Sequence, residues 1–121
     1  MSLAGERRNS LPLSEKVRIE IYVPDRPEAN YQNLLDAFAD EFTEAFGGAT
    51  VLREFEGRFL SASGEKEIEK MNLVYADLPL NLPEYQNEIG VYLDEIKEAA
   101  YEVLNEESIL VTARTIFHVE N

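Results

Sequence analysis

The chain has 121 residues, of which 24 are acidic and 11 are basic, giving a formal net charge of -13. Such a surface repels phosphate backbones and anionic lipid, so we expect neither nucleic acid nor a membrane as partner. Cysteine is absent and His118 is the single histidine, which excludes disulfides, thiolate chemistry and a multi-histidine metal site within one chain. We therefore expect a cytoplasmic protein without metal or cofactor.

The polarity pattern divides the chain into an arm and one domain. Residues 1–14 are polar and aperiodic, which predicts a flexible N-terminal arm. Residues 15–121 suffice for one hydrophobic core and predict a single domain. The first strand is expected at 16–23, where Val17, Ile19 and Ile21 alternate with polar residues.

A helix is expected next, at 27–46, because large apolar residues recur along it at helical spacing before Gly47-Gly48 stops it. Strands follow at 49–55 and 67–76, with a separate short strand at 58–60 and a bulge near 69–71. A second helix is expected at 83–105 and a last strand at 108–118.

This order of elements predicts an α+β fold of the ferredoxin-like βαββαβ type. Right-handed crossovers place both helices on one face of an antiparallel sheet, and the short segment 58–60 would add an extra hairpin strand. The sheet's other face is then left open.

Several short motifs carry a fold-level resemblance. Phe46-Gly47-Gly48-Ala49-Thr50 ends the first helix, Gly57-Arg58-Phe59 and Gly64 follow, Glu69 opens a long strand, and 105–111 closes the second helix. This run, within 16–119, resembles small uncharacterised bacterial and phage proteins of ferredoxin-like topology. The wider fold resembles ACT-type regulatory domains, dimeric α/β-barrel proteins and trimeric copper-tolerance-like proteins. The resemblance implies a fold and supplies no catalytic residues.

The open face of the sheet is the candidate site. If Val17 and its alternating partners face the helices, Arg18, Glu20 and Tyr22 face away from them. Thr112 and Arg114 of the last strand, Arg53 with Phe55, and Lys70 with Asn72 are expected to complete this surface. The tentative ligand-binding set, suited to a small anion, is Arg18, Tyr22, Arg53, Lys70 and Arg114. The alternative is cross-strand pairing of Arg18 and Arg114 with Glu20.

Other polar residues carry weaker signals. Asp36, Asp40 and Glu44 share one helix face, but they spread over about 12 Å, too far for one cation to gather, so a solvated face is expected. His118 has the chemistry of a general base, but its place near the chain end favours an exposed residue without a role.

Three functional interpretations remain open. The leading one is a self-associating binding or regulatory module, with a dimer favoured, that uses an open face combining Tyr22, Phe55, Val74 and Ile116 with basic residues. The second is a small enzyme of the dimeric α/β-barrel kind, with Arg18, Arg114, Tyr75 or His118 at work in a pocket on that face. The third is an acidic accessory protein whose helices engage a basic partner.

Overall fold

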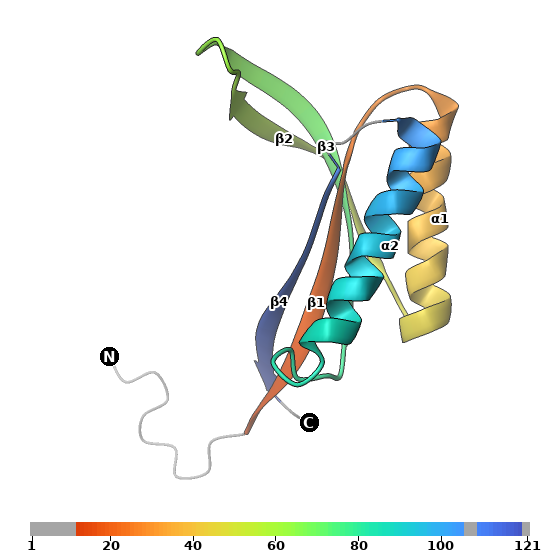
Figure 1. The fold of residues 1–121 in the computed structure, drawn as a ribbon, viewed down its shortest axis with the longest axis vertical. Coiled ribbons are helices and arrows are strands. Elements are labelled where there is room, and N and C mark those ends of the chain that lie inside the picture. The colour runs from red at the N-terminus through yellow and green to blue at the C-terminus, as the bar shows by residue number, and fades with distance from the viewer. Residues whose placement is uncertain (1–11, 106–108, 120–121) are drawn as a thin grey trace.

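The computed structural model describes residues 12–105 and 109–119, which form two helices and four strands (Figure 1). The elements are β1 (Leu13–Pro24), α1 (Ala29–Phe46), β2 (Thr50–Leu60), β3 (Lys66–Leu78), α2 (Gln86–Leu104) and β4 (Leu110–Val119). The strands form one antiparallel sheet in the order β2-β3-β1-β4, and both helices cover the same face. The predicted ferredoxin-like βαββαβ fold is confirmed.

The first strand is longer than its alternation pattern indicates. β1 begins at Leu13, inside the predicted arm, because Leu13 and Ser14 pair with Val119 and His118 of β4. The backbone pairing of β1 with β4 thus begins before the alternation of apolar and polar side chains does. Residues 1–11, the rest of the predicted arm, lie outside the described residues.

Strand β2 corrects two details of the prediction. The separate short strand expected at 58–60 is the end of one continuous strand, Thr50–Leu60. The bulge lies between Leu52 and Phe55 of β2, not at 69–71. Glu54 adopts a left-handed φ of 59° there, and its backbone N–H donates to Oδ1 of Asn72 at 3.0 Å. The irregularity breaks strict alternation, so Leu52 and Phe55 point to the same face of the sheet.

The two helices end as their sequences indicate. α1 stops at Gly47, whose φ of 86° and N–H bond to the Thr43 carbonyl, 3.0 Å long, form a left-handed C-cap. α2 stops in the same way at Asn105, with φ 51°. Neither helix has the length and apolar character needed to span a membrane.

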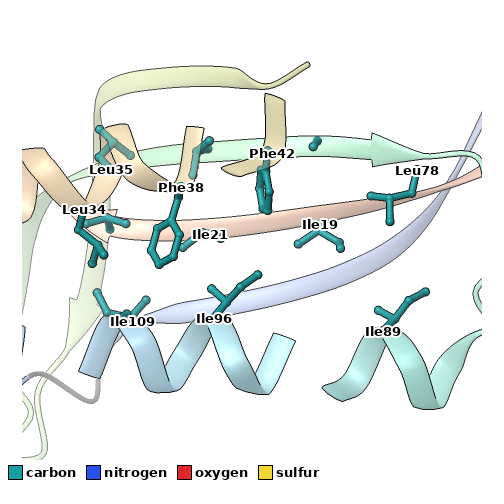
Figure 2. Close-up of a cluster of buried hydrophobic side chains, with 14 of the residues drawn as sticks. Ile19, Ile21, Leu34, Leu35, Phe38, Phe42, Leu78, Ile89, Ile96 and Ile109 are labelled. Atoms are coloured by element: carbon teal, nitrogen blue, oxygen red, sulfur yellow. The ribbon is translucent and has the colours of Figure 1, made fainter. Parts of the chain in front are cut away.

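The hydrophobic core lies between the sheet and the helices (Figure 2). Val17, Ile19 and Ile21 of β1 are wholly buried, and so are Leu35 and Phe42 of α1. The Phe42 ring contacts the ring of Phe46. The Phe46 ring in turn meets that of Tyr92 on α2 edge-on, with 5.7 Å between the ring centres. The apolar stripes of both helices thus close over one face of the sheet.

The β2–β3 hairpin projects beyond the rest of the sheet. β1 ends at Pro24, opposite Met71, so the segments 56–60 and 66–70 pair only with each other. Figure 1 shows this end of the hairpin bending away from the helices. We call residues 56–70 the hairpin arm. A two-stranded ribbon has little packing of its own, and this one leaves Phe59, Leu60 and Ile68 exposed.

Candidate functional site

The face of the sheet that the helices leave uncovered is built around β1. Arg18, Glu20 and Tyr22 point to this side, opposite the core residues between them. Cross-strand neighbours share a face, so the pairing partners of these three complete it. On β3 and β4 they are Leu73, Tyr75, Asp77, Leu110, Thr112 and Arg114. We call this surface the open face.

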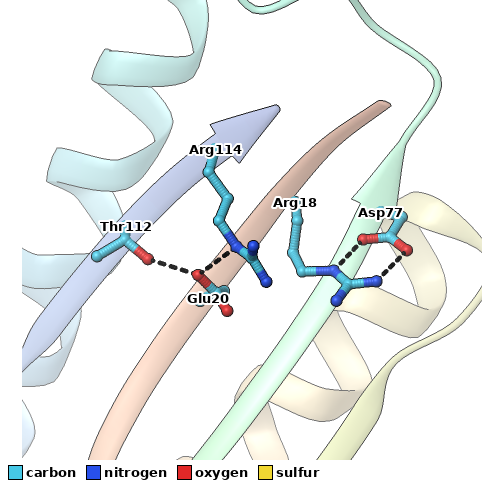
Figure 3. A network of polar contacts seen from close by, with 5 residues as sticks. All are labelled: Arg18, Glu20, Asp77, Thr112 and Arg114. Carbon is cyan, nitrogen blue, oxygen red and sulfur yellow. Dashed lines mark hydrogen bonds and ion pairs between the residues drawn. The ribbon is translucent and has the colours of Figure 1, made fainter. Parts of the chain in front are cut away.

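One half of the open face is a network of ion pairs (Figure 3). Arg18 binds the Asp77 carboxylate through Nε at 2.7 Å and Nη2 at 3.0 Å, a bidentate pair. Glu20 accepts from Thr112 Oγ1 at 3.1 Å and from Arg114 Nε at 3.2 Å, although its own side chain is only 9% exposed. Arg18 and Arg114 lie directly opposite each other in the ladder, so the two carboxylates offset a like-charge pair.

Local contacts tune the groups of this charged half. The hydrogen bond to Asp77 raises the pKa of Arg18, whose guanidinium lies over the Tyr75 ring, 4.1 Å from its centre. Burial raises the pKa of Tyr22, and the nearby Glu20 carboxylate raises it further. The charged half is therefore internally balanced, and an anion arriving there would compete with Asp77 and Glu20 for the two arginines.

Three of the five predicted site residues lie together on this face, and two do not. Arg18 lies opposite Arg114 in the ladder, and Tyr22 lies farther along β1 on the same face, opposite Leu110. The prediction for Arg53 is wrong, because its Nη2 lies 3.4 Å from the Asp36 carboxylate of α1, on the helix side. The prediction for Lys70 is also wrong, because Lys70 precedes Met71 in β3 and therefore points to the face opposite that of Met71.

Two further residues expected on the open face belong to the helix side. Val74 pairs with Ile21 and is wholly buried in the core. Asn72 pairs with Val23, is 1% exposed, and donates from Nδ2 to Asp25 at 3.1 Å while accepting from Glu54. Asn72 therefore joins the β1–α1 loop to the bulge of β2 instead of facing a ligand.

The other half of the open face is apolar and hollow. Tyr22 and Phe55 meet edge-on, with ring centres 6.2 Å apart. They line a cavity of about 390 Å³, a volume in the range of small-molecule sites. The remaining lining residues are Pro24, Gly57, Phe59, Glu67, Glu69, Met71 and Leu110.

Gly57 shapes this cavity through its missing side chain. A Cβ at this position would lie 2.7 Å from Cε2 of Phe59 and 3.3 Å from Cγ of Met71. The Phe59 ring therefore packs across the bare backbone of Gly57 and forms one wall of the cavity. In the sequence Gly57 stands out only as part of the Gly57-Arg58-Phe59 motif, and nothing local indicates that an aromatic ring two residues away covers it.

The residues proposed for catalysis lie outside this cavity. Arg18, Arg114 and His118 are absent from its lining, and Tyr75 lines a different pocket, of about 350 Å³, beside Gly47 and Gly48. His118 is a half-buried residue of β4. Within residues 12–105 and 109–119, no three His, Asp or Glu side chains lie close enough to hold a metal ion.

Comparison with solved structures supports the fold and leaves the function open. No known protein family matches the sequence, and no curated protein is similar to it. CutA1 from Oryza sativa superposes with a TM-score of 0.54 at 13% identity, covering 85% of this chain and 81% of that one. The divalent cation tolerance protein Cut A1 from Thermus thermophilus gives 0.51 at 14% identity, covering 83% and 82%.

A phage SAM lyase in complex with S-methyl-5'-thioadenosine gives a TM-score of 0.51 at 13% identity, covering 94% of this chain and 96% of that one. At such identities these likenesses establish the fold alone. They place the chain among the small ferredoxin-like proteins, which agrees with the resemblance drawn from the sequence.

Proposed function

We propose that this protein is a self-associating binding module in which the open face of one chain packs against a second copy. The observation that carries the proposal is the contrast between an acidic helix layer and an open face whose charged half is balanced and whose other half is largely apolar. The contrast in charge supports the choice of face, and the apolar half supplies the driving force.

The helix layer is unsuited to pairing with a copy of itself. α1 carries four acidic residues and no basic one, and α2 carries five acidic residues and one lysine. Two such layers would repel each other over the whole contact. The charged half of the open face has no such excess, because Arg18 and Arg114 are matched by Asp77 and Glu20.

The apolar half leaves large side chains in water. Phe59 is 50% exposed and Leu110 53%, and both line the cavity, while Leu52 is 49% exposed and lies on the same face of the sheet as Phe55. Contiguous apolar surface rimmed by polar groups is typical of a protein–protein interface. The hairpin arm adds reach, because segments 56–60 and 66–70 pair only with each other and extend past the end of β1.

Light scattering on a sizing column, at low and high salt, tests this proposal. We expect an oligomer that resists salt, since apolar burial is not screened. Leu52→Glu should convert it to a monomer, because the new carboxylate would be buried in the interface. Val91→Glu is the matched control, since Val91 is an exposed apolar residue of α2, and this variant should keep the wild-type mass.

A monomeric wild type would contradict the proposal. The acidic helix layer would then be the surface to test, with pull-down of basic proteins at low and high salt.

A small enzyme is the second candidate. The cavity of about 390 Å³ and the nearly full mutual coverage with the phage SAM lyase favour it over other activities. The test is incubation with S-adenosylmethionine, followed by chromatography for S-methyl-5'-thioadenosine, the compound bound in that structure. Absence of this compound above the uncatalysed background would remove the candidate.

A further inference from the structure

We propose that the cavity on the apolar half of the open face binds a small aromatic cation. All its lining residues come from one chain. The inference therefore goes beyond self-association and does not require a second copy. It rests on the aromatic walls of the cavity, on the sorting of charge across the hairpin arm, and on the unpaired carboxylate at the rim.

The walls provide the first argument. Tyr22, Phe55 and Phe59 line the cavity with three aromatic side chains, and Met71 adds a polarizable thioether residue to the lining. Aromatic faces carry negative potential and attract cations, while planar apolar ligands pack well between rings and a thioether. The cavity walls thus suit a flat, apolar ligand with a positive charge.

Charge sorting across the hairpin arm provides the second argument. Phe59 pairs with Glu67, and Gly57 pairs with Glu69, so both carboxylates share the cavity side of the ribbon. The basic residues of the arm occupy the alternate positions, which point to the opposite side. These are Arg58, Lys66 and Lys70. Glu56 also lies on the back, opposite Lys70 and ion-paired with Arg58, so the ribbon offers only acid to the cavity and mixed charge to its back.

The two carboxylates are not equivalent. Glu69 forms an ion pair with Nη2 of Arg26 at 3.2 Å, so its charge is largely offset. The side chain of Glu67 makes no ion pair or hydrogen bond with another described residue, and no Lys or Arg lines the cavity. The Glu67 carboxylate therefore favours a ligand with positive charge and disfavours an anion.

Isothermal titration of three quinoline probes tests the inference. The cation is 1-methylquinolinium, the neutral probe is quinoline and the anion is quinoline-3-carboxylate, all near neutral pH. We expect the cation to bind about fivefold to tenfold more tightly than quinoline, and the carboxylate to bind most weakly. Light scattering on the same samples reports the oligomeric state separately.

Three variants locate the site. Glu67→Gln should lower affinity for 1-methylquinolinium to near that of quinoline and leave quinoline unchanged, whereas Glu98→Gln on α2 makes the same charge change without effect. Gly57→Ala should weaken all probes, because the added Cβ displaces the Phe59 ring. Leu52→Glu should keep probe binding even if it abolishes self-association, because Leu52 is not part of the cavity lining.

The inference is overturned if quinoline binds as tightly as its methylated cation, or if none of the probes binds. It is also overturned if Glu67→Gln and Glu98→Gln behave alike. Binding that disappears only in Leu52→Glu would place the ligand at an interface between copies and would likewise contradict a site within one chain.

Discussion

The two faces of the sheet are made by the same strands and have opposite character. On the helix side, Ile19 and Ile21 are wholly buried and contact a continuous apolar core. On the open side, the residues between and beside them divide into a charged half around Glu20 and a hollow apolar half around Tyr22. Apolar burial, which stabilises the fold, is therefore concentrated on the helix side, while the groups able to contact a ligand or another chain lie on the open side.

The two faces should differ most in how much stability is lost when a phenylalanine is replaced by alanine. Phe42 is wholly buried on the helix side, so Phe42→Ala should lower the free energy of unfolding by about 3–5 kcal/mol. Phe59 is 50% exposed, so Phe59→Ala should cost about 1 kcal/mol or less. Urea melts of both variants at equal concentration measure the difference. Equal losses would show that the open face contributes to stability as the core does.

The next-largest effect is expected at Asn72, a buried polar residue of β3 next to the hairpin arm. Asn72→Ala removes the acceptor for the Glu54 N–H and the donor to Asp25, so we expect a loss of about 1–3 kcal/mol. Asn87→Ala, on an exposed position of α2, is the control and should be neutral or slightly stabilising. Urea melts give both values, and a neutral Asn72→Ala would mean that the bulge of β2 holds without its side-chain partner.

The smallest expected effect is a difference in alkaline stability. Burial raises the pKa of Tyr92 well above the ordinary value of 10.0, and the Glu41 carboxylate, which accepts its O–H at 3.1 Å, adds to the shift. A raised pKa favours the protonated form in the folded state, so this stabilisation is complete below pH 10.0 and is lost as pH rises above it.

Tyr92→Phe should therefore flatten the fall of the urea midpoint above pH 10.0. Tyr22→Phe should act in the same direction on the open face, where the pKa of Tyr22 is also raised. An unchanged alkaline slope in Tyr92→Phe would show that another group controls the transition.

The site could be predicted only where the strands are regular. In β1 the alternation placed Arg18 and Tyr22 correctly, because this strand pairs with both neighbours without a register shift. In β2 the same reasoning put Arg53 with Phe55, and the bulge between Leu52 and Phe55 reversed that relation. Glu54, the residue with left-handed φ, is not a glycine, so its residue type does not indicate the bulge.

The cavity was not predictable because its parts come from separate strands. Tyr22, Phe55 and Leu110 meet through pairings far apart in the chain, and each also fits an ordinary strand pattern. The cavity depends on where β1 ends relative to the β2–β3 hairpin and on the missing side chain of Gly57.

The order of the elements, the core face of β1 and both helices, and the glycine end of α1 could be derived from the amino-acid sequence. These properties follow from hydrophobic periodicity and from the conformational freedom of glycine, which act over a few neighbouring residues. The tertiary structure alone decided which carboxylate pairs with Arg18 and Arg114, where Arg53 and Lys70 point, and that an apolar cavity exists. Those outcomes depend on strand register and on a single bulge, which are set by contacts between distant parts of the chain.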